Sequence, residues 1–185
     1  MVNSGLRPTE AAERLREAIR SVRDFPKPGI VFRDVTTLLK DRDAFELAVE
    51  QLAAPFLQSR IDTVVGIESR GFICGAALAH RLHAGFVPIR KTGKLPAKTV
   101  GEEYELEYGT DRIEIHADAI RKGDRVLLHD DLLATGGTMN AAVRLVERLG
   151  GLVVGISFLV ELDFLHGREK ISGQDIFSVI HYDQE

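Results

Sequence analysis

The segment from Val126 to Ala142, VLLHDDLLATGGTMNAA, limits the possible folds more strongly than any other part of the chain. An apolar run reaches two adjacent aspartates, and a loop of Ala, Thr and Gly follows before apolar residues recur at helical spacing. A strand that passes through a small-residue loop into a helix is typical of open parallel sheets, which bind ligands at the carboxyl ends of their strands. The sequence therefore predicts an α/β domain with a ligand site at this loop.

Apolar runs elsewhere supply the rest of that domain. Five of them predict strands, at residues 61–67, 86–90, 125–129, 152–160 and 176–180. Helical spacing of apolar residues predicts helices at residues 9–22, 43–55, 75–82 and 142–149. Asp43 and Glu46 have the spacing of a capping box for the second helix, whose apolar stripe would be Phe45, Val49, Leu52 and Phe56. This alternation implies a central, mostly parallel sheet flanked by helices.

Two stretches interrupt the alternation. Residues 24–34 contain two prolines and a glycine, so we expect a loop there. Residues 104–116 alternate apolar and polar side chains around the turn residues Gly109, Thr110 and Asp111, which predicts a hairpin projecting from the main sheet.

Composition narrows the class of protein. The chain has 185 residues, 44% of them hydrophobic, which suits one domain over residues 1–185. The net charge is -4 and no basic block occurs, so a nucleic-acid or anionic membrane surface is disfavoured. Cys74 is the only cysteine, which excludes an intrachain disulfide and fits a reducing compartment. No secretory signal and no run of about 18 apolar residues occurs, so we expect a cytoplasmic protein.

The loop after the aspartates has the chemistry of a phosphate site. Ala134, Thr135, Gly136, Gly137 and Thr138 leave backbone N–H groups free to converge at the start of a helix, whose positive end favours an anion. The alternative is that these residues only form a turn and begin a helix.

The two aspartates need a different partner. Asp130 and Asp131 would repel a phosphate, but they suit hydroxyl donors such as those of a ribose. A sugar that carries a phosphate is therefore the expected ligand.

These residues resemble a known family. VLLHDDLLATGGT is similar to the motif that binds 5-phosphoribosyl-1-pyrophosphate (PRPP) in type I phosphoribosyltransferases. DFPKPGIVFRDVTTLL, GIESRGFICG, IRKTGKLP and YELEYG stand in the family's order, and the match is close to members that use adenine. The resemblance implies the type I phosphoribosyltransferase fold, with a small N-terminal hood at about residues 1–40 and a mobile hairpin lid at about residues 93–117.

The resemblance also implies how pyrophosphate is bound. Matching family positions place Ser69, Arg70, Arg90 and Lys91 at the pyrophosphate, and the position of Arg90 is one that can reach across a dimer interface. Cations there would stabilise the negative charge of the leaving group. Mg²⁺ would be held mainly through PRPP, with no direct protein ligand. The matching peptide is cis in the family, so a cis bond is expected between Glu68 and Ser69.

The base would lie in the hood. By resemblance, Val31 covers one face of adenine and Leu132 the other, while the backbone around Val31, Phe32 and Arg33 hydrogen-bonds the purine edge. For Phe32, and for Phe25 nearby, core packing is the stronger interpretation from the residues alone.

Glu107 matches the family's catalytic acid, which exchanges a proton with adenine N7, and Tyr108 of the lid matches a residue that packs at the site. From the residues alone, a carboxylate on a solvated hairpin is the stronger interpretation of Glu107.

The implied reaction converts adenine and PRPP to AMP and pyrophosphate in purine salvage, in a homodimer. An oxopurine (hypoxanthine or guanine) phosphoribosyltransferase is one alternative, and a PRPP-sensing nucleic-acid-binding regulator is another. His129 stands where family members usually carry an aliphatic residue, and we interpret it as a buried, hydrogen-bonded histidine. The remaining histidines show no metal-ligand spacing.

Overall fold

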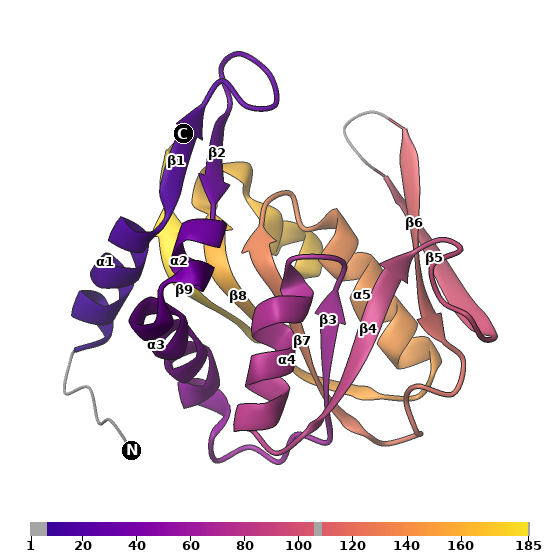
Figure 1. Cartoon of the computed structure of the whole chain (residues 1–185). Helices are drawn as coiled ribbons and strands as arrows, with labels where there is room; N and C mark the ends of the chain where they lie inside the picture. The colour runs from indigo at the N-terminus through magenta and orange to yellow at the C-terminus, as the bar shows by residue number, and fades with distance from the viewer. Residues whose placement is uncertain (1–6, 106–108, 185) are drawn as a thin grey trace.

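A seven-stranded sheet forms the centre of the computed structural model, which describes residues 7–105 and 109–184 (Figure 1). The strand order is β5-β6-β4-β3-β7-β8-β9. The neighbours from β4 to β9 are parallel, whereas β6 pairs antiparallel with both β4 and β5. The strands are β3 (Thr63–Ile67), β4 (Gly85–Lys91), β5 (Thr99–Glu105), β6 (Thr110–His116), β7 (Arg125–Leu133), β8 (Leu152–Leu162) and β9 (Ile176–Tyr182). The predicted mostly parallel sheet is therefore confirmed.

Helices cover both faces of this sheet (Figure 1). All five residues of β3 are buried, as expected for a parallel strand that helices cover on both faces. The α-helices are α1 (Pro8–Ala18), α2 (Thr36–Lys40), α3 (Arg42–Ala53), α4 (Gly71–Arg81) and α5 (Gly137–Arg148). Three short 3₁₀ helices complete the described elements: η1 (Ala54–Phe56), η2 (Asp163–Leu165) and η3 (Gly167–Ile171).

The core is divided by the sheet into two clusters. On one side, Leu15 of α1, Leu52 of α3 and Leu78 of α4 pack together. On the other side, Leu145 of α5 packs with Ile115 of β6. Removing these side chains from water is the main force that holds the layers together. Within the described residues, no helix is long and apolar enough to cross a membrane.

The N-terminal region corrects two predictions. α1 ends at Ala18, and the following residues form β1 (Arg20–Arg23), which pairs antiparallel with β2 (Val31–Asp34). Val22 therefore lies in a strand opposite Phe32 and not in a helix, and residues 31–34 are not a loop. Helical spacing persists in the sequence through Val22, but pairing with β2 satisfies the backbone groups in an extended form instead.

The start of α3 corrects a third prediction. Asp41, not Asp43, caps the helix, because its carboxylate accepts hydrogen bonds from the backbone of Asp43 and Ala44. Of the predicted stripe, Leu52 and Phe56 are buried, while Phe45 and Val49 are partly exposed. The helix ends before Pro55, as expected.

Candidate active site

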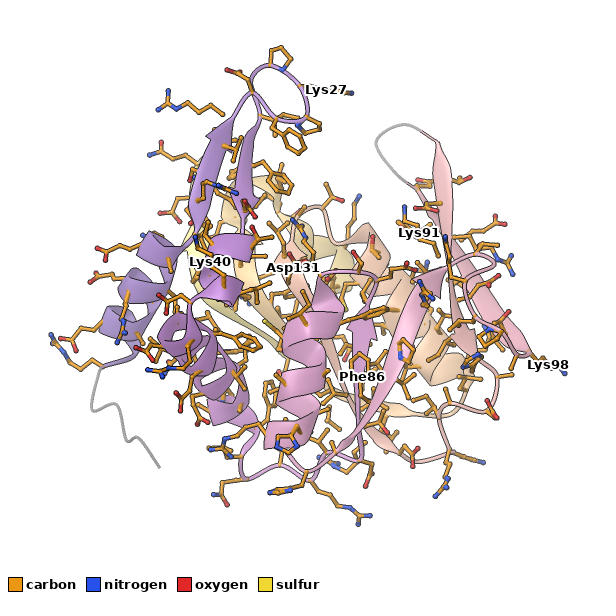
Figure 2. All side chains as sticks on the ribbon, in the orientation of Figure 1. Lys27, Lys40, Phe86, Lys91, Lys98 and Asp131 are labelled. Carbon is orange, nitrogen blue, oxygen red and sulfur yellow. The ribbon has the colours of Figure 1, made fainter. Side chains whose placement is uncertain are left out.

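The candidate site lies at the edge of the sheet between the N-terminal hairpin β1–β2 and the hairpin β5–β6 (Figure 1). Figure 2 shows Asp131 near the middle of this edge, with Lys91 toward the β5–β6 hairpin. β7 extends to Leu133, so both aspartates lie within the strand rather than after it as predicted. The strand continues because β8 pairs with it as far as Leu133.

The predicted phosphate loop forms a small pocket at the start of α5. Gly136 has φ +79° and directly precedes the helix, a conformation that glycine adopts without steric cost. The pocket has a volume of about 90 Å³ and its walls include the residues predicted to bind phosphate: Ala134, Thr135, Gly136, Gly137 and Thr138. Asp130 and Leu132 also line it. Convergent backbone N–H groups and the helix N-terminus make this pocket suitable for an anion.

A second pocket of about 320 Å³ adjoins the first, because Asp130 and Thr138 line both. Lys91 lies on its far wall, where its ammonium is 3.2 Å from Asp111 Oδ2. Tyr104 donates to the same carboxylate oxygen at 3.2 Å. From the sequence, Asp111 was expected only to form a turn, and its position in this pocket follows from the pairing of β6 with β4 and β5.

The two aspartates have different surroundings, which affect their pKa values differently. Asp131 is 5% exposed, and its Oδ2 lies 2.8 Å from Nε of Arg70. Burial raises the pKa of Asp131, and the Arg70 charge opposes that rise. Burial, and secondarily the charge of Asp131, raise the pKa of Asp130 well above its usual value. Asp131 is buried and Asp130 is half-buried, so it is costly to keep both side chains charged, as expected for acceptors kept ready for a ligand.

This burial predicts a pH-dependent gain in stability for Asp130→Asn. Because the folded state favours protonated Asp130, the stability that it contributes is complete below the unfolded pKa and is lost as pH rises through the raised folded pKa. Asparagine does not ionise, and its Oδ1 can keep the bond that Asp130 accepts from the Asp131 N–H at 2.9 Å. Thermal unfolding should show Tm raised by about 2–4 °C at about pH 8 and by less at about pH 4.

The matched control is Asp118→Asn, which changes an exposed aspartate in the turn after β6. Its Tm should follow that of the unsubstituted chain at both pH values. An equal Tm gain for Asp130→Asn at both pH values would contradict the burial argument.

Two of the predicted pyrophosphate residues, Arg90 and Lys91, contact Glu68. Arg90 binds both carboxylate oxygens of Glu68, with Nη2 at 2.8 Å, and Glu68 also accepts from the Lys91 N–H at 3.0 Å. The Arg90 guanidinium is the first cause of the lowered pKa of Glu68. The peptide between Glu68 and Ser69 is cis, as expected. Arg90 is thus engaged with Glu68, the residue before Ser69, whereas Arg70 lies at Asp131.

Arg70 lies between the hood and the aspartates, because it contacts both Asp131 and Phe32. The Arg70 guanidinium carbon lies 5.1 Å from the centre of the Phe32 ring, and that ring packs edge-on against Phe25 at 5.2 Å. Phe25 is 52% exposed, so the prediction of core packing was wrong for it, and Phe32 is partly exposed. The hairpin stands away from the two cores, so neither ring is enclosed.

The strand that was predicted to bind the base, β2, is anchored by its residue Arg33. Arg33 stacks over the Tyr182 ring at 4.0 Å and donates to Ser21 Oγ at 2.6 Å. The Arg33 side chain is thus engaged with Tyr182 and Ser21. Tyr182 was not singled out from the sequence, because an aromatic residue at the end of a strand carries no specific signal.

Two other side chains differ in part from their predictions. His129 is fully buried and Nδ1 contacts Ser157 Oγ at 3.0 Å, but Nε2 has no hydrogen-bond partner among the described residues. Burial lowers its pKa to about 4. His181 was expected to lack acidic partners, yet the fold brings it within 4.8 Å of Glu161 and Asp163. Cys74 is buried, and burial raises the pKa of its thiol to about 12.

The predicted hairpin is confirmed as β5 paired with β6. It continues the main sheet through β4 and rests on α5, where Arg144 Nε binds Glu102 Oε1 at 2.7 Å. The predicted site residues Glu107 and Tyr108 lie outside the described residues.

Comparison with known proteins defines the class. A family model described as "Phosphoribosyl transferase domain" matches residues 36–182, and the chain therefore belongs to the phosphoribosyltransferase family. An adenine phosphoribosyltransferase of Acidobacterium capsulatum is 56% identical over 181 residues, which cover 97% of this chain and all of the relative. One of Brachyspira hyodysenteriae is 54% identical, covering 91% of this chain and 99% of the relative. Within the family, this chain groups with the adenine phosphoribosyltransferases.

Solved structures agree with this grouping. The adenine phosphoribosyltransferase of Rhodothermus marinus is 55% identical, with a TM-score of 0.90 over 94% of this chain and 99% of that one. The enzyme of Saccharomyces cerevisiae, complexed with an imino-altritol bisphosphate and adenine, is 39% identical, with a TM-score of 0.87 over 92% of this chain and 99% of that one. The type I phosphoribosyltransferase fold is thus confirmed.

Proposed function

We propose that this chain transfers the 5-phosphoribosyl group of PRPP to adenine, giving AMP and pyrophosphate in purine salvage. The observation that supports this most directly is the pair of adjoining pockets that meet at Asp130 and Thr138. One is walled by the backbone of a helix N-terminus and the other carries Lys91, which suits a ligand with a phosphate at each end. The relatives that are complexed with adenine support the choice of base.

Different residues of the two pockets bind different parts of PRPP. The 5-phosphate binds residues 134–138, and Asp130 and Asp131 accept hydrogen bonds from the ribose hydroxyls. Ser69, Arg70, Arg90 and Lys91 surround the pyrophosphate. Lys91 stabilises the charge that develops on the leaving group, while Arg90 acts through Glu68, whose carboxylate it holds beside the Ser69 peptide.

The base lies between the hood and Leu132. Val31 covers one face and Leu132 the other, and the backbone from Val31 through Phe32 to Arg33 recognises the purine edge. Glu107 exchanges a proton with N7 as N9 attacks the sugar carbon, and Tyr108 helps the lid to exclude water from the site.

The larger pocket has three carboxylates, and two of them are already paired, which suits a magnesium ion that is carried by PRPP rather than by the protein. Mg²⁺ prefers oxygen ligands, but Glu68 is bound by Arg90 and Asp111 by Lys91. Asp130 thus remains as the carboxylate beside the ribose, which agrees with an ion held mainly through PRPP. When bound, Mg²⁺ neutralises charge on the pyrophosphate.

The proposal also covers the oligomeric state and the cellular location. A homodimer is proposed because the family resemblance implies one. A cytoplasmic location is supported by the single cysteine, since disulfide-free chains suit a reducing compartment.

A pyrophosphate-release assay tests the function. With PRPP and Mg²⁺, we expect turnover with adenine that exceeds turnover with hypoxanthine or guanine at least about 100-fold, because a site built to bond one purine edge leaves polar groups unpaired with another. Removing Mg²⁺ with a chelator should abolish turnover. Turnover with an oxopurine would contradict the choice of base. PRPP binding without turnover, together with salt-sensitive binding to nucleic acid, would favour a PRPP-sensing regulator.

A further inference from the structure

The segment that follows β8 packs directly against the back of the phosphate loop. A Cβ atom added to Gly136 would lie 2.2 Å from the Gly167 carbonyl oxygen. A Cβ atom added to Gly167 would lie 2.2 Å from the Ala134 carbonyl oxygen. The two backbones therefore meet with no room for a side chain at either glycine, and the position of Gly167 limits the position of the loop.

Gly167 is in turn held by its neighbour Arg168. The Arg168 guanidinium binds both carboxylate oxygens of Glu161, with Nε at 2.6 Å and Nη2 at 2.7 Å, and donates to the Ile176 carbonyl at 3.2 Å. Ser178 Oγ donates to the same carboxylate at 2.5 Å. Glu161 is 4% exposed at the end of β8, so this ion pair joins η3 to the ends of β8 and β9. A bidentate pair with a buried carboxylate, as here, fixes geometry closely even though the Arg168 side chain is partly exposed.

We propose that the Arg168–Glu161 pair, acting through the contact between Gly167 and Gly136, positions the phosphate loop and so sets the affinity for the 5-phosphate end of PRPP. This inference rests on the proposed function. The small pocket is walled by residues 130, 132–139 and 158, so Glu161 and Arg168 are positioning residues that act from behind the loop. The N–H groups of the loop must converge to within hydrogen-bond distance of one phosphate, and a displacement of the Gly136 backbone would spoil that convergence.

The first variant is Gly167→Ala, because φ at Gly167 lies outside the positive region and the new methyl group would press directly on the Ala134 carbonyl of the loop. Gly85→Ala is the matched control, since its Cβ would come no closer than 3.6 Å to another residue. Calorimetry with ribose 5-phosphate should show Kd raised about tenfold or more for Gly167→Ala. KM for PRPP should rise by a similar factor, whereas KM for adenine should match that of the control.

If Gly167→Ala fails to fold, Glu161→Gln tests whether the Arg168–Glu161 pair positions the loop. Glutamine keeps the shape and the Ser178 contact but loses the charge that binds Arg168. Its Kd for ribose 5-phosphate should rise about fivefold, a typical coupling between contacting residues, with KM for adenine unchanged. An unchanged Kd, or equal increases in both KM values, would overturn the inference. If the unsubstituted chain neither binds ribose 5-phosphate nor turns over PRPP, the proposed function itself fails.

Discussion

Asp131→Asn is expected to lower kcat/KM for PRPP by about 10²–10³-fold, the loss typical of removing one preorganised polar group from an active site. Asparagine has the same shape as aspartate but carries no charge. Asp131 is 5% exposed and its Oδ2 lies 2.8 Å from the Arg70 guanidinium, so the substitution leaves that guanidinium without its counter-charge. It also weakens the acceptor that a ribose hydroxyl would use. Initial rates at varied PRPP and saturating adenine measure the effect.

The same measurement on Asp118→Asn provides the control, because Asp118 is exposed and follows β6. Circular dichroism on both variants tests whether any loss comes from unfolding. If folded Asp131→Asn kept kcat/KM within about threefold of the unsubstituted chain, the ribose role would be wrong, since a buried charge-assisted bond contributes more than that.

Glu107→Gln is expected to lower kcat by about 10²–10⁴-fold, the usual contribution of a positioned general acid or base. Glutamine can still donate and accept hydrogen bonds but cannot exchange a proton with adenine N7. KM for PRPP should stay close to that of the unsubstituted chain, because PRPP is bound by other residues of the proposed site. The dependence of kcat on pH should lose the limb that Glu107 produces.

Glu105→Gln is the matched control for this substitution. Glu105 is an exposed carboxylate at the end of β5, two residues away in the same hairpin. Equal losses in the two variants would indicate that the hairpin responds to its total charge, and would contradict a proton-transfer role for Glu107 alone.

The hood shows where local patterns mislead. Helical spacing runs on through Val22, and the prolines and glycine of residues 24–34 indicate a loop. Strand β2 exists because β1 pairs with it and because Arg33 packs on Tyr182 from the far end of the chain. A local sequence pattern contains no information on such a contact. The resemblance therefore predicted where the hood lies in the chain, but the sequence did not predict its β1–β2 hairpin.

The sequence by itself determined the alternation of strands and helices, the small-residue loop at residues 134–138 and the family. The first two depend on residues that are close together in the chain, and the family depends on several short motifs that each can be read locally. Apolar periodicity specifies strand or helix, and Gly136 is the residue type that its positive φ requires. Only the tertiary structure decided which residues support that loop. The contact of Gly136 with Gly167 and the pair of Arg168 with Glu161 join the loop to elements that follow it in the chain. Such contacts form only when β7, β8 and β9 are assembled side by side, because the paired strands carry both partners to one edge of the sheet.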